Sequence, residues 1–249
     1  MPLPVYVLNL ARSVERRRFM SEELTRSGLS AVFVDAIDAV DLRRQAAVAP
    51  SGLTLGEWAC LQTHREGWRR ISASGSPAIV LEDDVQLLEG FVEIATAVAA
   101  RARPDDLVLF GHHSSRQGPG EGAEVSWWRR GVGFGRTIGR PAEYPMGAYA
   151  MLIGPMAAAH LDRFAEPSRM PTDWVTGYSP RVGVRLLAIT PPCAVPASIA
   201  KATTIEDRAS EAHHQARARP TPPAALSNLW LFLRKLGIAT SAYTFRLER

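Results

Sequence analysis

The sequence has very little cysteine: Cys60 and Cys193 are the only two cysteines in 249 residues, and they lie far apart. This excludes a framework of several disulfides and gives no paired-cysteine metal motif. A reducing cytoplasm is the expected compartment. The sequence also lacks a run of about 18 apolar residues, so no transmembrane helix is expected. The start, MPLPVYVLNLARS, has no basic segment before its apolar run and predicts a first strand, not a signal peptide.

A strong excess of positive charge is absent as well. The formal net charge is +4, and aromatic residues do not alternate with the arginines in a stacking pattern. This composition does not indicate nucleic-acid binding, and a phosphate-bearing ligand or an anionic membrane surface suits it better. Apolar residues make up 46% and charged residues 22%, which is typical of a globular domain.

Apolar, β-branched runs alternate with amphipathic stretches through the first half of the chain. This alternation predicts an α/β fold with a mainly parallel central sheet and helices on both faces. Strands are expected at 5–8, 31–36, 78–81, 106–110, 149–153 and 182–189, and helices at 13–27, 54–71, 88–102 and 155–164. Ser13 is the expected cap of the first helix, and Thr54 with Glu57 has the spacing of a capping box. The glycine-rich segment 111–141 predicts a long loop.

Composition changes sharply toward the end of the chain. We expect one domain over 1–205, a linker or exposed arm over 206–225 and an amphipathic basic helix over 226–249. A helix of this kind suits peripheral contact with the inner face of the cytoplasmic membrane, or a partner's groove. The alternative is that it packs on its own domain.

Three consecutive acids, Glu82, Asp83 and Asp84, follow the apolar run 78–81. Burying an unpaired carboxylate costs several kcal/mol or shifts its protonation, and adjacent like charges add to that cost. Either the strand ends there and the acids point into solvent, or a cation lies among them.

Polar residues also follow the first strand. Asn9, Arg12 and Arg16 come just past residues 5–8, and the two arginines are four residues apart, on one helical face. Ligands of parallel sheets bind beyond the carboxyl ends of strands, where these residues and the acids would meet. Arginines bind phosphate well and carboxylates bind hard divalent metals, so this edge predicts a site for a metal and a phosphate. A surface ion pair is the alternative for the arginines.

Five motifs occur in a recognisable order. They are VYVLNLARSVERR from residue 5, LTLGEWACLQTHREGW at 53–68, IVLEDDV at 79–85, MGAYAMLIGPMAAAHL at 146–161 and MPTDW at 170–174. Together they resemble glycosyltransferase family 25, especially its bacterial lipooligosaccharide galactosyltransferases, which are related to the collagen galactosyltransferases. The resemblance implies a GT-A-type single Rossmann-like domain, here followed by a helical C-terminal tail. It also implies inverting transfer of a sugar, typically galactose from UDP-galactose, to a hydroxyl of lipopolysaccharide or another glycan acceptor.

The chain departs from the family pattern in two places. The family usually carries Gly-Glu-Ile-Gly-Cys and then Ser-His, whereas this chain has Trp58, Ala59 and Thr63. Thr172 stands where the proline-acid motif usually has an apolar residue. These changes bear on the choice of donor or acceptor more than on the class of reaction.

The resemblance and the chemistry together assign roles to the donor side. Mn²⁺ or Mg²⁺ suits the acids, with Asp84 as a direct ligand and Glu82 or Asp83 completing its shell or holding the ribose. Arg12 and Arg16 are expected at the diphosphate or nucleotide, and Asn9 near the base.

Inversion needs a carboxylate that takes the proton of the acceptor hydroxyl. Asp173 is the candidate, and a helix cap is the alternative for it. Glu57 and His64 are seven residues apart, so they share a helical face. Glu57 is either a donor contact or only part of the capping box. His64 is a core histidine, a metal ligand or an acceptor contact.

Other residues have two interpretations each. Gly147 and Tyr149 either wall the sugar pocket or shape the entry of a strand. Trp127 and Trp128 either stack on an acceptor sugar or form the core of the long loop. His112 and His113 follow a strand end, from which one could reach the metal.

The sequence leaves two other functions to consider. A non-catalytic descendant that binds carbohydrate or nucleotide sugar is the main alternative. A two-component receiver domain is disfavoured, because its acidic pair follows the first strand and a matching aspartate and lysine are missing here.

Overall fold

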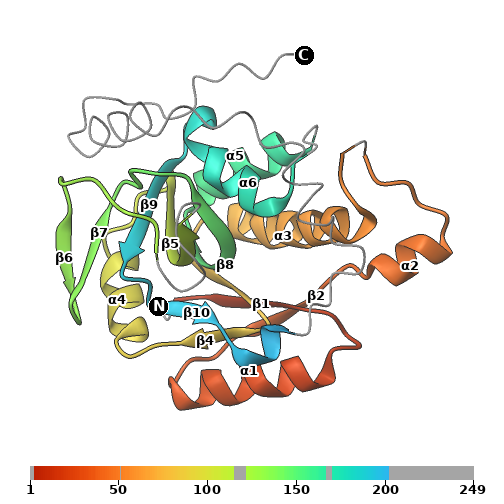
Figure 1. Cartoon of the computed structure of the whole chain (residues 1–249), viewed down its shortest axis with the longest axis horizontal. Coiled ribbons are helices and arrows are strands. Elements are labelled where there is room, and N and C mark those ends of the chain that lie inside the picture. The colour runs from red at the N-terminus through yellow and green to blue at the C-terminus, as the bar shows by residue number, and fades with distance from the viewer. Residues whose placement is uncertain (1–2, 51, 115–121, 167–169, 202–249) are drawn as a thin grey trace.

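A computed structural model describes residues 3–50, 52–114, 122–166 and 170–201. Within these ranges the protein has three layers, a central sheet with helices on both faces (Figure 1). The predicted linker at 206–225 and C-terminal helix at 226–249 lie outside the described residues and stay predictions. No helix in the described ranges is both long and apolar enough to cross a membrane.

The central sheet has eight strands in the order β2-β1-β3-β8-β5-β9-β7-β6. Their bounds are β1 Val5–Asn9, β2 Val32–Asp35, β3 Ala78–Glu82, β5 Asp106–Ser114, β6 Arg130–Gly133, β7 Arg136–Gly139, β8 Pro145–Ile153 and β9 Arg185–Thr190. A second, two-stranded sheet pairs β4 (Val85–Leu87) with β10 (Ala194–Pro196).

The α/β class predicted from the sequence is confirmed, and the sheet is mixed. β1 runs parallel to β2 and β3, and β5 runs parallel to β9. β8 runs antiparallel to both neighbours, β3 and β5, and within the described ranges a hairpin, not a helix, lies between β5 and β8 in the sequence. The segment predicted as a long loop contains that hairpin, formed by β6 and β7. The carboxyl ends of β1, β3, β5 and β9 therefore share one edge with the start of β8.

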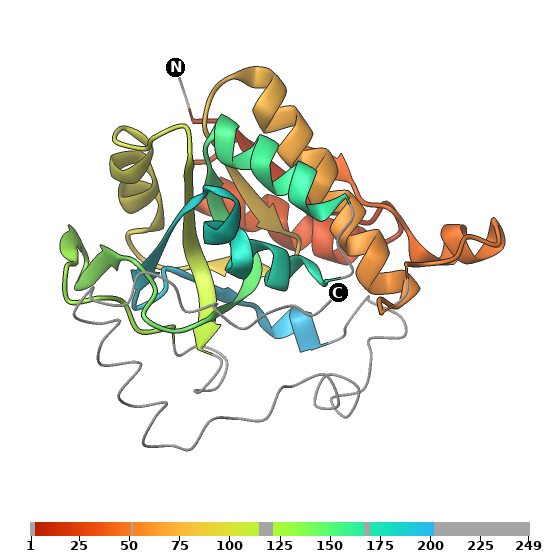
Figure 2. The same ribbon diagram turned by 90° about the horizontal axis from the view of Figure 1, so that it is seen from above.

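Six α-helices are described: α1 Val14–Arg26, α2 Ala39–Arg44, α3 Leu55–Ser74, α4 Phe91–Ala99, α5 Pro155–Ala165 and α6 Thr172–Tyr178. Helices α3, α5 and α6 share one core with one face of the sheet, and α1 and α4 share a second core with the other face (Figure 2). Side chains of β3 alternate between the two cores, as the pleat requires: Val80 lies in the first, and Ile79 and Leu81 lie in the second.

Helix α3 is fixed at both ends. Thr54 Oγ1 accepts a hydrogen bond from Glu57 N at 3.2 Å, and Glu57 Oε2 accepts one from Thr54 N at 2.9 Å, so the predicted capping box is confirmed. Gly75 ends the helix in the left-handed conformation, with φ +68°. Ser13 precedes α1 as predicted, but its side chain makes no capping hydrogen bond.

Candidate functional site

Glu82 ends β3, Asp83 and Asp84 form the turn that follows it, and Glu82 and Asp83 point to opposite sides of the sheet. Successive side chains of a strand point to opposite faces. Glu82 follows Val80 toward α3, whereas Asp83 continues the side of Ile79 and Leu81, toward α1. The acids therefore have different partners, although they are neighbours in sequence.

Asp83 is held by two buried side chains. Its Oδ2 accepts a hydrogen bond from Asn9 Nδ2 at 2.8 Å, and its Oδ1 accepts one from Arg16 Nη1 at 2.9 Å. All three residues are at most 8% exposed. Asp83 thus ties β1 and α1 to the end of β3, and both of its oxygens already have protein partners.

Asp84 shares the Arg16 guanidinium. Its Oδ2 lies 2.8 Å from Arg16 Nη1. Burial and the neighbouring Glu82 and Asp83 carboxylates raise the pKa of Asp84 to about 7, although Arg16 opposes the shift. A position that disfavours further negative charge so strongly is suited to a cation.

Arg12 pairs with another carboxylate, that of Asp38. Its Nε is 2.5 Å from Asp38 Oδ2, and its side chain remains 45% exposed. Asp38 also caps α2 by accepting a hydrogen bond from Val40 N. The structure therefore brings Asn9 and Arg16 to the acids and directs Arg12 to the start of α2. Contact of either arginine with a diphosphate stays a prediction.

On the α3 side, Glu82 meets His64. His64 Nε2 lies 3.2 Å from Glu82 Oε1, and His64 is 1% exposed. Burial alone would lower the pKa of His64, but the neighbouring Cys60 and Glu82 outweigh it and raise the pKa to about 9. The surroundings of this imidazole therefore favour positive charge.

Cys60 completes a compact group with these two residues. One ligand atom each from Cys60, His64 and Glu82 lies within 4.8 Å of the other two. Within the described ranges this is the one group of three or more histidine, cysteine, aspartate or glutamate side chains that meets this spacing, so Glu82, Asp83 and Asp84 do not form such a group. Cys60 was not predicted from the sequence, because the two cysteines show no metal-ligand spacing between themselves. The four-residue spacing from Cys60 to His64, one helical turn, was the available signal.

The start of α6 lies against the same group. Thr172 Oγ1 is 3.7 Å from Cys60 Sγ. The next residue, Asp173, lies in the first turn of α6, and its Oδ1 accepts a hydrogen bond from Trp174 N at 3.0 Å. Asp173 is not the N-cap residue, which is Pro171. The predicted base therefore lies one residue from a side chain that contacts Cys60.

Tyr149 occupies a slot between two glycines. A Cβ atom on Gly111 or Gly147 would overlap the Tyr149 ring, and Gly147 has φ +87°. The Tyr149 hydroxyl is buried and has no hydrogen-bond partner among the described residues. Burial and the Glu82 carboxylate raise the pKa of Tyr149 above its usual range. The presence of glycine at 147 thus has a steric explanation, because a side chain there would overlap the Tyr149 ring. Contact of Tyr149 with a sugar stays a prediction.

Both ring nitrogens of His112 have partners in the fold. Its Nε2 lies 2.8 Å from Ile189 O, and its Nδ1 accepts a hydrogen bond from Ala123 N at 3.0 Å. Both ring nitrogens are engaged, so the idea that His112 could reach a metal is wrong. His113 lies beside Gly147, where a Cβ would come within 3.3 Å of its Nδ1.

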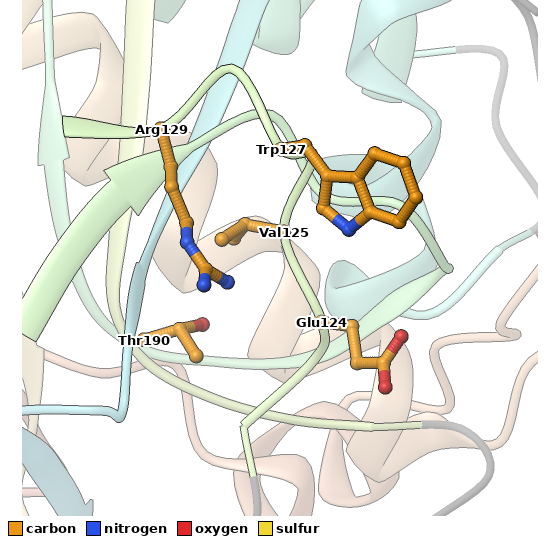
Figure 3. A pocket seen from close by; sticks show the side chains of 5 residues that line it. All are labelled: Glu124, Val125, Trp127, Arg129 and Thr190. Carbon is orange, nitrogen blue, oxygen red and sulfur yellow. The ribbon is translucent and has the colours of Figure 1, made fainter. Parts of the chain in front are cut away.

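The two tryptophans lie at the surface. Trp127 is 53% exposed and Trp128 is 81% exposed, so neither forms a core for the loop. Trp127 borders a hollow that is also lined by Glu124, Val125, Arg129 and Thr190 (Figure 3). Thr190 ends β9, so the hollow lies toward the same sheet edge as Glu82.

The fold and this edge define an α/β protein with a polar, acid-rich site at the carboxyl ends of its strands. Residues 3–117 match the model of glycosyltransferase family 25 (LPS biosynthesis protein). This match confirms the family resemblance predicted from the motifs. It also supports the prediction that the chain is a glycosyltransferase. It covers Asn9, Arg16, His64 and the acids, and it ends before Tyr149 and Asp173.

The other comparisons add less. No curated protein matches the chain. Among solved structures, a glycosyltransferase involved in the glycosylation of the major capsid of PBCV-1 matches with a TM-score of 0.40 and 10% identity. That match covers 75% of this chain and 82% of the other.

Proposed function

We propose that this chain is an inverting glycosyltransferase that moves a sugar from a UDP-sugar to a hydroxyl of lipopolysaccharide or another glycan. Galactose is the first choice of sugar. One observation supports the proposal: Glu82 and Asp84 lie within the stretch that matches the family model, at the carboxyl edge of the sheet, where ligands of such sheets usually bind.

A divalent Mn²⁺ or Mg²⁺ fits this edge. Two carboxylates, Asp83 and Asp84, share the Arg16 guanidinium there, and burial with the neighbouring Glu82 carboxylate raises the pKa of Asp84 to about 7, which supports a place for a cation. Asp84 and Glu82 would hold the ion, because Asp83 already has a partner on each oxygen. When bound, the metal would neutralise the negative charge that develops on the departing UDP.

The protein's own residues orient these groups. Arg16 is buried and fixes one oxygen of Asp84, and Asn9 and Asp83 anchor the turn that carries it. Asn9 Oδ1 has no hydrogen-bond partner among the described residues and could accept one from the base of the nucleotide. Tyr149 and Gly147 would line the sugar between β3 and β5.

Asp173 is the proposed base. It would take the proton from the acceptor hydroxyl while that oxygen attacks the anomeric carbon from the side opposite UDP. Its place beside Thr172, which contacts Cys60 on α3, supports this role because Glu82 lies in the same group. The exposed ring of Trp127 would stack on an acceptor sugar farther along the edge.

The test is a UDP-release assay with the full chain. UDP-galactose, UDP-glucose and UDP-N-acetylhexosamines are offered with Mn²⁺ and a bacterial lipooligosaccharide acceptor. We expect UDP release with one donor class, dependent on acceptor and abolished by excess chelator. Saturable UDP-sugar binding without UDP release would overturn the enzyme proposal in favour of a binding protein. Full activity in chelator would overturn the metal.

A further inference from the structure

We infer that Cys60, His64 and Glu82 form a binding centre for a divalent cation of the zinc class, distinct in ligand chemistry from the all-oxygen site proposed for the donor. The two sets share Glu82, whose carboxylate has two oxygens. The inference does not depend on sugar transfer and stands or falls by itself.

The three ligand types suit a borderline-soft metal. Thiolate, imidazole and carboxylate are the three ligand types that zinc takes in proteins, whereas Mn²⁺ and Mg²⁺ prefer oxygen. A thiolate and a carboxylate carry two negative charges, which a divalent cation balances. Binding would release the proton of the Cys60 thiol, because metals take cysteine as the thiolate.

The spacing also fits. Ligand atoms around tetrahedral zinc lie about 3.3 to 3.8 Å apart, as follows from the usual zinc–ligand bond lengths. His64 Nε2 and Glu82 Oε1 are 3.2 Å apart, and all three ligand atoms lie within 4.8 Å of one another. Small side-chain rotations would therefore close the group around an ion, with one position left for a fourth ligand.

The group is held rigidly. Cys60 and His64 lie one turn apart on α3, which is capped at its start and packs into the core through Leu61 and Trp68. His64 Nδ1 is buried and has no hydrogen-bond partner among the described residues. Thr172 Oγ1, 3.7 Å from Cys60 Sγ, is placed to donate a hydrogen bond to a thiolate. This hydroxyl occurs where the family motif usually has an apolar residue.

Cobalt tests the site without reference to activity, because a thiolate bound to Co²⁺ gives a charge-transfer band in the near ultraviolet. The chain contains only two cysteines, so such a band must come from Cys60 or Cys193. Cys193 is fully buried and burial raises the pKa of its thiol to about 12, which makes Cys193→Ser the matched control. We expect the full chain to show the band with one equivalent of Co²⁺, Cys193→Ser to keep it and Cys60→Ser to lose it.

Zinc affinity supplies the second measurement. In competition with a chromophoric chelator, Cys60→Ser, His64→Gln and Glu82→Gln should each weaken Zn²⁺ binding roughly tenfold or more. Glu82→Gln changes a partly exposed side chain, so it keeps the test open if His64→Gln fails to fold. Absence of the band, survival of the band in Cys60→Ser, or zinc affinity unchanged in a folded Glu82→Gln would each overturn the site.

Discussion

Nη1 of Arg16 lies 2.8 Å from Oδ2 of Asp84. The same nitrogen lies 2.9 Å from Oδ1 of Asp83, so one buried guanidinium serves two carboxylates. Glu82, the third acid, pairs instead with His64 on the α3 side. Arg16 therefore has a demonstrable role in positioning the acids, whether or not it also contacts a donor.

Asp83→Asn is expected to destabilise the protein. Asp83 is buried and bonded on both oxygens, and an amide would place an NH₂ group against a donor and remove the charge that pairs with Arg16. Because Asp84 still pairs with Arg16, we expect a loss of about 2 to 3 kcal/mol in the free energy of unfolding, measured by urea denaturation. Asp41→Asn, which breaks the exposed pair with Arg44, should change it by less than about 0.5 kcal/mol. Equal losses in the two variants would refute the anchoring role of Asp83.

Asp84→Asn should leave the fold intact and abolish sugar transfer. The amide relieves repulsion with Glu82 and Asp83, and it removes the charge that is proposed to bind the metal. We expect UDP release to fall roughly 100-fold or more, with an unchanged thermal midpoint. Asp162→Asn is the control, because Asp162 binds Arg65 and Arg69 between α5 and α3 and is not among the proposed site residues. A folded Asp84→Asn that turns over at more than a third of the normal rate would remove Asp84 from the site.

Asp173→Asn should separate binding from chemistry. The side chain keeps an oxygen that can accept from Trp174 N, so the start of α6 should persist. An amide cannot take the proton of the acceptor hydroxyl, and we expect transfer to fall roughly 100- to 10,000-fold. UDP affinity, measured calorimetrically, should stay within about twofold, because Asp173 is assigned to the acceptor side. A drop in UDP affinity equal to the drop in transfer would make Asp173 a donor residue instead.

The longer strands and helices could be predicted from the sequence because burial periodicity is local, whereas short elements such as β4, β10 and α2 were not predicted. The runs at 5–8, 78–81 and 106–110 became strands, and the Thr54–Glu57 spacing became a capping box. The direction of β8 could not be predicted, because it depends on the path that the chain takes from β5 to β8. The glycine-rich residues before β8 carry no clear period, so the hairpin was hidden.

The site shows the same limit. The sequence placed Glu82, Asp83 and Asp84 at the carboxyl edge, and the structure agrees. It treated them as one acidic cluster, whereas the pleat sends Glu82 to His64 on α3 and Asp83 to Arg16 on α1. Residues that contact only after folding, such as Cys60 with Thr172, have no local signal. Partners of side chains depend on packing between elements, which one sequence does not specify.

His112 should make the fold sensitive to acid. Burial and the neighbouring His113 lower the pKa of His112 to about 4, although the hydrogen bond to Ile189 O acts in the other direction. Its Nδ1 accepts from Ala123 N, so protonation would break that bond. In the unfolded chain the pKa returns to about 6.5. Above that pH both states are neutral and the stability is fully present.

As the pH falls from about 6.5 toward 4, His112 becomes protonated in the unfolded state but stays neutral in the folded state. The free energy of unfolding then decreases by up to about 1.4 kcal/mol per pH unit, to a total of up to about 3 kcal/mol. His112→Gln cannot titrate, so its stability should fall less over this interval than that of the unmodified chain. Urea denaturation at pH 7.5, 6.0 and 4.5 measures both, and groups common to the two proteins cancel in the difference. If the two curves run parallel between pH 6.5 and 4.5, His112 is not the buried neutral group that its two hydrogen bonds indicate.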